Sequence, residues 1–155
     1  MQGHFDANLT DPAVIYKILD RFAKFGKPIQ ITEFDLPIRD EACQARFTRD
    51  FMTLIFSHPA VEAFTMWGFW EGRMWQSQAA LVRKDWTLKP NGQAYMDLTT
   101  KEWKTDVTAK TADDGSCGTR GFLGDYAITV SHHGVEKSAT VKLVKEGTNV
   151  TVKME

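Results

Sequence analysis

Two carboxylates, Glu33 and Asp35, stand at the end of a short, largely apolar run that spans residues 29–37. Side chains alternate across a strand, so this run predicts one face that carries Ile29, Ile31, Glu33 and Asp35. The carboxyl ends of parallel strands are where α/β folds place their chemistry, and a buried carboxylate is costly unless it is paired. The two acids therefore indicate either a catalytic pair or side chains that face solvent where the strand ends.

The stretch 67–75 carries three tryptophans, Trp67, Trp70 and Trp75, together with Glu71 and Arg73, and is expected to be a loop. Exposed indoles are unfavourable unless another group stacks on them. The apolar C–H face of a sugar ring suits such stacking, and the two charged side chains could bond its hydroxyls. The pattern favours a carbohydrate site, but the same rings would also pack a loop onto its scaffold. For Trp70, in mid-loop, both interpretations stand.

Gln2 and His4 lie in a short predicted strand at the N-terminus. Their side chains could face the same end of the sheet as the two acids. A lone histidine is more often structural than catalytic. Beside two carboxylates, however, a histidine can hold a nucleophile ionised and oriented.

The elements that position these residues follow from spacing and from capping signals. Asp11 with Pro12 predicts the start of a helix that Gly26 ends. Asp40 predicts the start of a second helix, which His58-Pro59 end. The expected order is strand 2–5, helix 11–26, strand 29–35, helix 40–58, strand 61–67 and helix 90–102. Short loops in this order imply parallel strands with right-handed crossovers.

After residue 103 the apolar period changes from helical to alternating. We expect strands at 107–111, 117–122, 126–131, 139–144 and 149–154, separated by glycine-containing turns. The fold class is therefore α/β for residues 1–103, followed by a small antiparallel β module at 104–155. Adjacent His132 and His133 would point to opposite faces of a strand, so they are not expected to chelate one metal.

The size and charge of the chain limit the classes of partner that it is expected to bind. The chain has 155 residues, 43% of them hydrophobic, and a formal net charge of −1. This length suits one domain, or a partial domain with a small module, and the charge predicts no nucleic acid and no anionic membrane as partner. No apolar run approaches the ~20 residues that cross a bilayer, and residues 1–6 carry no export signal. Cys43 and Cys117 lack metal-ligand spacing and are expected to be two free, buried thiols, with no metal site.

Three separate motifs, followed by Lys89-Pro90, carry a resemblance to a known family. Gln2-Gly3-His4, residues 31–35, the loop 67–75 and Lys89-Pro90 resemble strands six, seven and eight and the last helix of family 10 glycoside hydrolases, the endo-β-1,4-xylanases. The resemblance covers about two-thirds of the chain in the correct order. It implies the C-terminal part of a (β/α)8 TIM barrel, xylan as substrate and no cofactor.

The resemblance also implies a role for each candidate residue. Glu33 is the nucleophile of a retaining hydrolysis, and His4 and Asp35 form the hydrogen-bonded pair that tunes it. The resemblance also implies that Gln2, Trp67, Glu71 and Trp75 take part in substrate binding, and Trp70 is added to these candidates as an indole in the same loop. The loop departs from the family pattern Trp-Gly-x-x-Asp-x-x-Ser-Trp, because Glu71 replaces the aspartate and Met74 the serine.

One essential group is not found in the sequence. A retaining glycosidase needs a second carboxyl roughly 5 to 5.5 Å from the nucleophile, which in this family is the glutamate of an Asn-Glu pair. None of the three asparagines, Asn8, Asn91 and Asn149, precedes a glutamate, and the barrel-like part is about half the ~200 residues that such a barrel takes.

We therefore expect little or no xylanase activity from this chain alone, with self-association or the missing N-terminal barrel portion as its protein partner. The alternative is an inactive xylan-binding or structural fragment. The full-length parent is expected to be secreted or held at the cell surface. The tail, through residues 111–115 and 120–126, resembles transthyretin-like, carboxypeptidase regulatory-like β modules, in which glycine and aspartate form turns.

Overall fold

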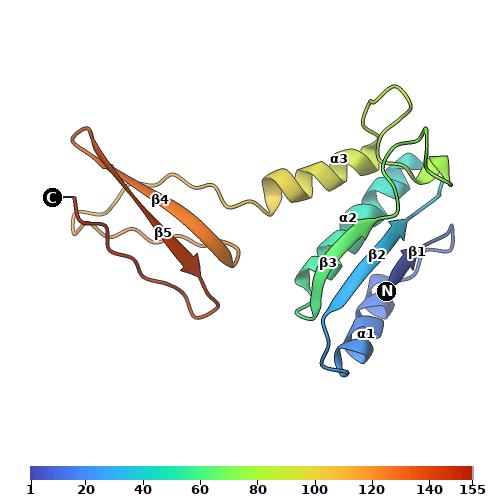
Figure 1. The fold of residues 1–155 in the computed structure, drawn as a ribbon, viewed down its shortest axis with the longest axis horizontal. Coiled ribbons are helices and arrows are strands. Elements are labelled where there is room, and N and C mark those ends of the chain that lie inside the picture. The colour runs from blue at the N-terminus through green and yellow to red at the C-terminus, as the bar shows by residue number, and fades with distance from the viewer. Residues whose placement is uncertain (155) are drawn as a thin grey trace. The chain divides into compact units, whose positions relative to one another are not determined.

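The computed structural model describes residues 1–154, which divide into two compact units, Met1–Lys101 and the residues from Glu102 onward. Each unit has its own secondary structure (Figure 1). The candidate residues identified above all lie in the first unit. No helix in residues 1–154 is both long enough and apolar enough to cross a membrane.

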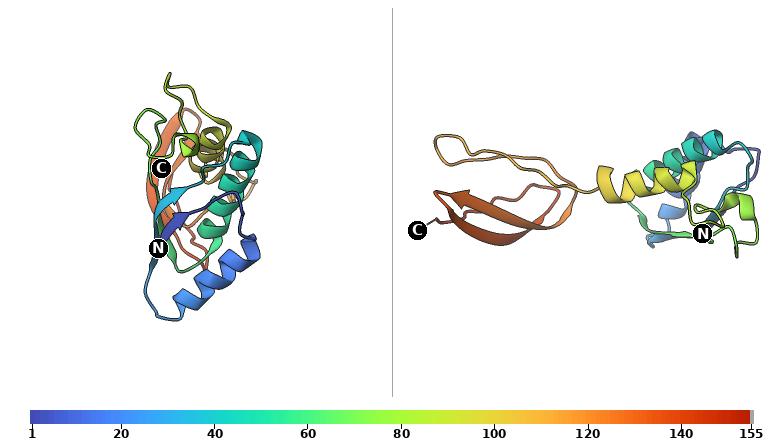
Figure 2. Two further views of the ribbon diagram at one scale, coloured as in Figure 1. Left: turned by 90° about the vertical axis from the view of Figure 1, so that its right-hand side faces the viewer. Right: turned by 90° about the horizontal axis from the view of Figure 1, so that it is seen from above.

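The first unit is built on a three-stranded parallel sheet in the order β1-β2-β3, as the alternation of elements predicted. Helices α1 and α2 connect the strands and cover one face of the sheet (Figures 1 and 2). Helix α3 packs against α2 and continues into a π-helical turn. The bounds are β1 Gln2–His4, α1 Pro12–Ala23, β2 Ile29–Asp35, α2 Glu41–Ser57, β3 Val61–Met66, α3 Pro90–Asp97 and the π-turn Leu98–Glu102.

Local signals set the ends of the helices. The Asp11 carboxylate accepts a hydrogen bond from the backbone N–H of Ala13, and the Asp40 carboxylate accepts one from Cys43, so each side chain satisfies a free amide of the first turn. The segment after α1 turns through Gly26, whose φ of 65° lies in the left-handed region that favours glycine. Both predicted caps are confirmed.

The core lies between the covered face of the sheet and α1 and α2. Phe34 of β2 stacks on Phe51 of α2, with ring centroids 4.8 Å apart and planes 13° from parallel. Phe5 packs edge-on against Phe51 at 5.0 Å. The buried members of this cluster are Ile15, Leu19, Ile29, Ile31, Phe34, Leu36, Phe47, Phe51 and Ile55.

Strand β2 departs from the simple alternation that the sequence predicted. Ile31 pairs with Phe64 and Phe34 with Met66, so three steps along β2 match two steps along β3. The extra residue of this bulge reverses the alternation of faces. Ile31 and Phe34 thus both reach the core, and Glu33 and Asp35 lie on the opposite face. The prediction that the two acids share a face with Ile29 and Ile31 was wrong, although the acids do share a face with each other.

The second unit contains one antiparallel hairpin, β4 Gly124–His132 with β5 Val135–Leu143. His133 and Gly134 form its two-residue turn with φ of 48° and 79°, as tight hairpins require. Half-buried apolar side chains gather on one face, and polar side chains cover the other. The apolar face carries Tyr126, Ile128, Val130, Ala139, Val141 and Leu143.

Three of the five strands expected in the second unit were wrong, since residues 107–111, 117–122 and 149–154 are irregular. A strand needs a paired neighbour, and glycines at 118 and 121 weaken one of these runs further. Cys117 is exposed rather than buried as expected. The placement of His132 and His133 together in one strand was also predicted wrongly. His133 lies in the turn rather than in a strand, and its ring centroid is 4.1 Å from that of His132.

Candidate active site

The pairing of β1 with β2 assembles the polar end of the sheet. Gln2 pairs with Glu33 and His4 pairs with Asp35 in the parallel register. Gly3 stands between Gln2 and His4 and points to the core, where an added Cβ would lie 3.1 Å from Ile31. Two neighbouring strands therefore present their polar side chains on one face, at the carboxyl end of β2.

The carboxylate of Glu33 is held at both oxygens. Gln2 Nε2 donates to Glu33 Oε1 at 3.2 Å, and His4 Nε2 lies 3.2 Å from Oε2. The side chain of Glu33 is partly exposed. It is thus oriented by two neighbours while remaining accessible from solvent.

Asp35 is the buried partner of the pair, with a side chain only 1% exposed. Its Oδ1 lies 2.9 Å from His4 Nδ1, and its Oδ2 accepts a hydrogen bond of 2.9 Å from Trp75 Nε1. Both oxygens are therefore engaged, which compensates for the burial of the carboxylate.

His4 bridges the two carboxylates through its two ring nitrogens. The hydrogen bond to Asp35 is the largest cause of a raised pKa for His4, and the charges of Asp35 and Glu33 add to it, while partial burial opposes it. The protonated ring can donate to both acids at once, which a neutral imidazole cannot do. The arrangement therefore favours an imidazolium between two carboxylates.

Trp67 and Trp75 flank the same ring. Their indoles meet His4 edge-on, with centroids 6.0 Å and 6.2 Å away. Trp67 follows β3 directly. Its backbone N–H donates to the backbone carbonyl of Phe34 at 2.9 Å, which holds Trp67 beside β2. The two residues are 49% and 66% exposed, so broad aromatic surface is available next to Glu33.

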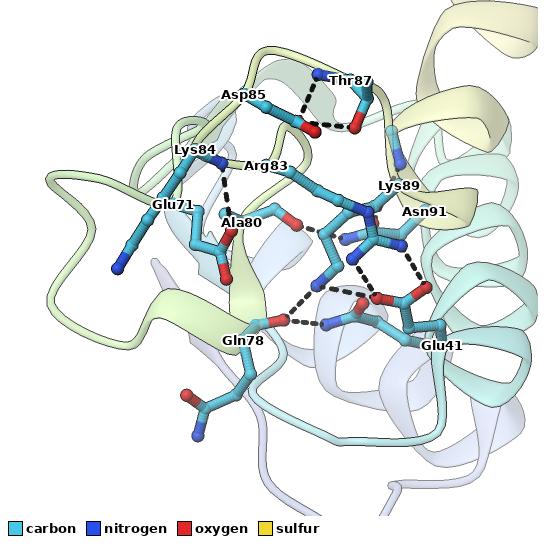
Figure 3. Close-up of polar contacts among 12 residues, drawn as sticks. Glu41, Glu71, Gln78, Ala80, Arg83, Lys84, Asp85, Thr87, Lys89 and Asn91 are labelled. Atoms are coloured by element: carbon cyan, nitrogen blue, oxygen red, sulfur yellow. Dashed lines mark hydrogen bonds and ion pairs between the residues drawn. The ribbon is translucent and has the colours of Figure 1, made fainter.

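Trp70 and Glu71 lie in a separate part of the loop. The indole of Trp70 stacks on Trp86 at 5.2 Å with planes 12° apart, and its Nε1 is buried without a hydrogen-bond partner within residues 1–154. Glu71 accepts a hydrogen bond of 3.0 Å from the backbone N–H of Lys84 (Figure 3). These contacts pack the loop and do not reach Glu33. Trp86 was not among the residues predicted from the sequence, although it stands in the short polar segment Asp85-Trp86-Thr87.

The structure thus brings together six of the eight candidate residues, namely Gln2, His4, Glu33, Asp35, Trp67 and Trp75. The arrangement offers one accessible, oriented carboxylate next to exposed aromatic surface. Asp35 is not available as a proton donor, because both of its oxygens are already bonded.

Comparisons with known proteins find similar sequences and similar structures. The family model described as "Glycosyl hydrolase family 10" matches residues 1–98. The anti-sigma-I factor RsgI6 of Acetivibrio thermocellus is 38% identical over 138 residues, which are 88% of this chain and 18% of that protein. Endo-1,4-beta-xylanase 2 of Arabidopsis thaliana is 30% identical over 132 residues, which are 84% of this chain and 12% of that protein. The chain therefore spans less than a fifth of the length of these relatives.

Solved structures match about two thirds of this chain. Xylanase 10B of Thermotoga petrophila in complex with xylobiose superposes with a TM-score of 0.59 and 27% identity, over 65% of this chain and 35% of that one. Native xylanase 10B of Thermotoga maritima gives the same TM-score and identity, over 65% and 36%.

Proposed function

The chain belongs to glycosyl hydrolase family 10, and we propose that it forms the C-terminal part of a retaining endo-1,4-β-xylanase. The observation that carries this proposal is the Glu33 carboxylate, held at both oxygens by Gln2 and His4 beside the exposed rings of Trp67 and Trp75. The named xylanases among its relatives support xylan as the polymer that it recognises.

Each residue has a defined task in this mechanism. Glu33 attacks the anomeric carbon of a xylose unit, so that a carboxylate oxygen–carbon bond forms as the bond to the leaving sugar oxygen breaks. His4 and Asp35 keep the attacking carboxylate oriented. Water then cleaves the covalent intermediate and releases Glu33. Trp67 and Trp75 hold the sugar rings by stacking.

The proton donor to the leaving oxygen comes, in this proposal, from polypeptide outside the 155 residues. Asp35 is bonded at both oxygens, and Glu71 is bound by the backbone of Lys84. The remaining strands of a (β/α)8 barrel are the natural source, and they would also pair with the outer edges of β1 and β3. We further propose that the complete protein acts outside the cell or at its surface, where polymeric xylan is found.

A second candidate function is binding of xylan without cleavage. Exposed Trp67 and Trp75 favour it, because stacking on sugar needs neither a nucleophile nor a proton donor. The two candidates differ in whether Glu33 reacts.

The deciding experiment is hydrolysis of xylan and of an aryl xylobioside by the purified chain, with its solution mass measured in parallel. An activated aryl leaving group needs little proton assistance, so a burst with this substrate and no turnover of xylan is expected. Robust turnover of xylan would overturn the assignment of the proton donor. No reaction with either substrate, together with measurable binding of xylobiose, would support the binding function instead.

A further inference from the structure

The indole that bonds Asp35 is not held in place by its own burial. Trp75 is 66% exposed and lies on the long connection between β3 and α3. Immediately after it, Ser77–Ala79 form a 3-10 turn, and Ala79 and Ala80 are buried. The position of Trp75 therefore depends on how the backbone of this turn is anchored.

Two buried side chains converge on one carbonyl of this turn. Lys89 Nζ donates to the carbonyl oxygen of Gln78 at 2.6 Å, and Gln44 Nε2 donates to the same oxygen at 2.8 Å (Figure 3 shows the Lys89 contact). Lys89 is 4% exposed and Gln44 is 0% exposed. Displacement of the turn would break both of these hydrogen bonds while the two side chains stay buried, which is unfavourable.

Gln44 also reaches the strand that carries Asp35. The same Nε2 donates to the carbonyl of Leu36 at 2.6 Å, and an amide nitrogen has two hydrogens for two such bonds. The reversed amide would place Oε1 against two carbonyl oxygens, so these bonds define its orientation. Gln44 of α2 thus ties the end of β2 to the turn that follows Trp75.

Lys89 binds this segment through its backbone as well as its side chain. Its backbone N–H donates to Leu81 at 2.9 Å, so one residue binds carbonyls at both ends of the buried segment. The ammonium lies 4.0 Å from Glu41, which Arg83 binds at both oxygens with bonds of 2.8 Å and 2.7 Å (Figure 3). Burial lowers the pKa of Lys89, and the charge of Glu41 opposes this effect.

We propose that Gln44 and Lys89 are positioning residues of the site. Through the Gln78 carbonyl they hold the Trp75 indole on Asp35, and through Asp35 they hold the His4 ring on Glu33. The inference rests on the proposed function only in treating Glu33 as the reacting group, because the contacts themselves do not depend on catalysis.

The test is solvent exchange of the Trp75 indole N–H, followed by NMR in the full 155-residue chain, with the signal assigned through Trp75→Phe. Lys89→Met removes the ammonium and keeps a similar stem. It should speed exchange of this indole at least about fivefold, in line with the loss of one hydrogen bond. Lys84→Met is the matched control, because Lys84 is exposed on the same loop and its ammonium does not contact the Gln78 carbonyl in Figure 3. It should leave exchange unchanged.

A general loss of structure would accelerate the backbone amides of β2 and α2 as well, whereas a positioning role accelerates the Trp75 indole alone. Wild-type exchange in a folded Lys89→Met chain would overturn the proposal. If that variant does not fold, Lys89→Arg keeps a buried cation but misplaces its donors, and it must show the same selective change in smaller measure. Neither readout uses an enzymatic substrate, so failure here is distinguishable from failure of the proposed function.

Discussion

Trp75 Nε1 donates a 2.9 Å hydrogen bond to Oδ2 of Asp35, a residue 40 positions earlier in the chain. The other oxygen of Asp35 faces His4, and His4 in turn reaches Glu33. A chain of contacts therefore runs from an exposed loop through a buried acid to the accessible carboxylate. Among these four residues only Asp35 is fully buried, so its position is the most constrained.

The first prediction concerns the ionisation of His4. Its pKa is raised above the ordinary 6.5, chiefly by the hydrogen bond to Asp35 and secondarily by Glu33. Asp35→Asn should lower the pKa of His4 towards 6.5, and Glu33→Gln should lower it less. NMR titration of the ring protons measures both changes. An unchanged titration in Asp35→Asn would show that the pair does not control this histidine.

The second prediction is the effect of this pKa on stability. A group whose pKa is raised by folding stabilises the native state fully below its unfolded pKa, and this contribution is lost as pH rises through the folded pKa. For His4 the loss begins near pH 6.5 and continues above it. The free energy of unfolding should therefore fall over this window more in the parent chain than in His4→Gln. Urea unfolding at a series of pH values gives both curves, and parallel curves would argue against the prediction.

The third prediction tests the nucleophile. Glu33→Gln keeps the size of the side chain and a carbonyl oxygen, but it removes the charge that attacks the anomeric carbon. The burst with an activated aryl xylobioside should fall by on the order of 10³-fold or more, whereas binding of xylobiose should be largely retained. Asp20→Asn, on the surface of α1, serves as a control for loss of one acid. Survival of the burst in Glu33→Gln would remove Glu33 from the mechanism.

The fourth prediction separates the two groups of tryptophans. Trp67→Ala should weaken xylobiose binding by roughly tenfold, since loss of a stacked aromatic ring costs about 1.4 kcal/mol. Trp86→Ala removes another exposed indole, which packs on Trp70 instead of facing His4. It should leave affinity within about twofold of the parent value. Calorimetry measures both, and equal losses in the two variants would show that the ligand binds elsewhere.

Local signals were enough to predict most of the first unit. The caps at Asp11 and Asp40, the parallel order of strands and the grouping of Glu33 with Asp35 all depend on residues close in sequence. The reversal of faces at the β2 bulge was missed, because it depends on how β2 pairs with β3. The one signal in the sequence was that the apolar residues Ile31 and Phe34 are three positions apart instead of two.

The anchors of the Trp75 loop were missed for a related reason. Gln44 and Lys89 are polar residues of types that usually face solvent. Lys89 was noted only for its place before Pro90, and no local signal marked either residue as buried. Their burial comes from carbonyls of Leu36 and Gln78, which approach only in the folded chain. In the second unit the error was to predict strands that do not form. An alternating pattern of apolar residues does not by itself supply a partner strand.

The fifth prediction tests the close packing beneath that loop. Gly92 in α3 is buried, and a Cβ there would meet the carbonyl oxygen of Leu81, the same carbonyl that accepts the Lys89 N–H. Alanine favours a helix over glycine by about 1 kcal/mol, but backbone at this contact cannot rotate away as a flexible side chain could. Gly92→Ala should therefore lower the free energy of unfolding by a net ~1–3 kcal/mol. Gly118→Ala, with open space around its Cβ, should change it by less than about 0.5 kcal/mol. Urea unfolding followed by tryptophan fluorescence compares the two variants. A Gly92→Ala chain as stable as its parent would mean that the backbone from Gln78 to Leu81 can shift to accommodate the added methyl group, despite its buried contacts.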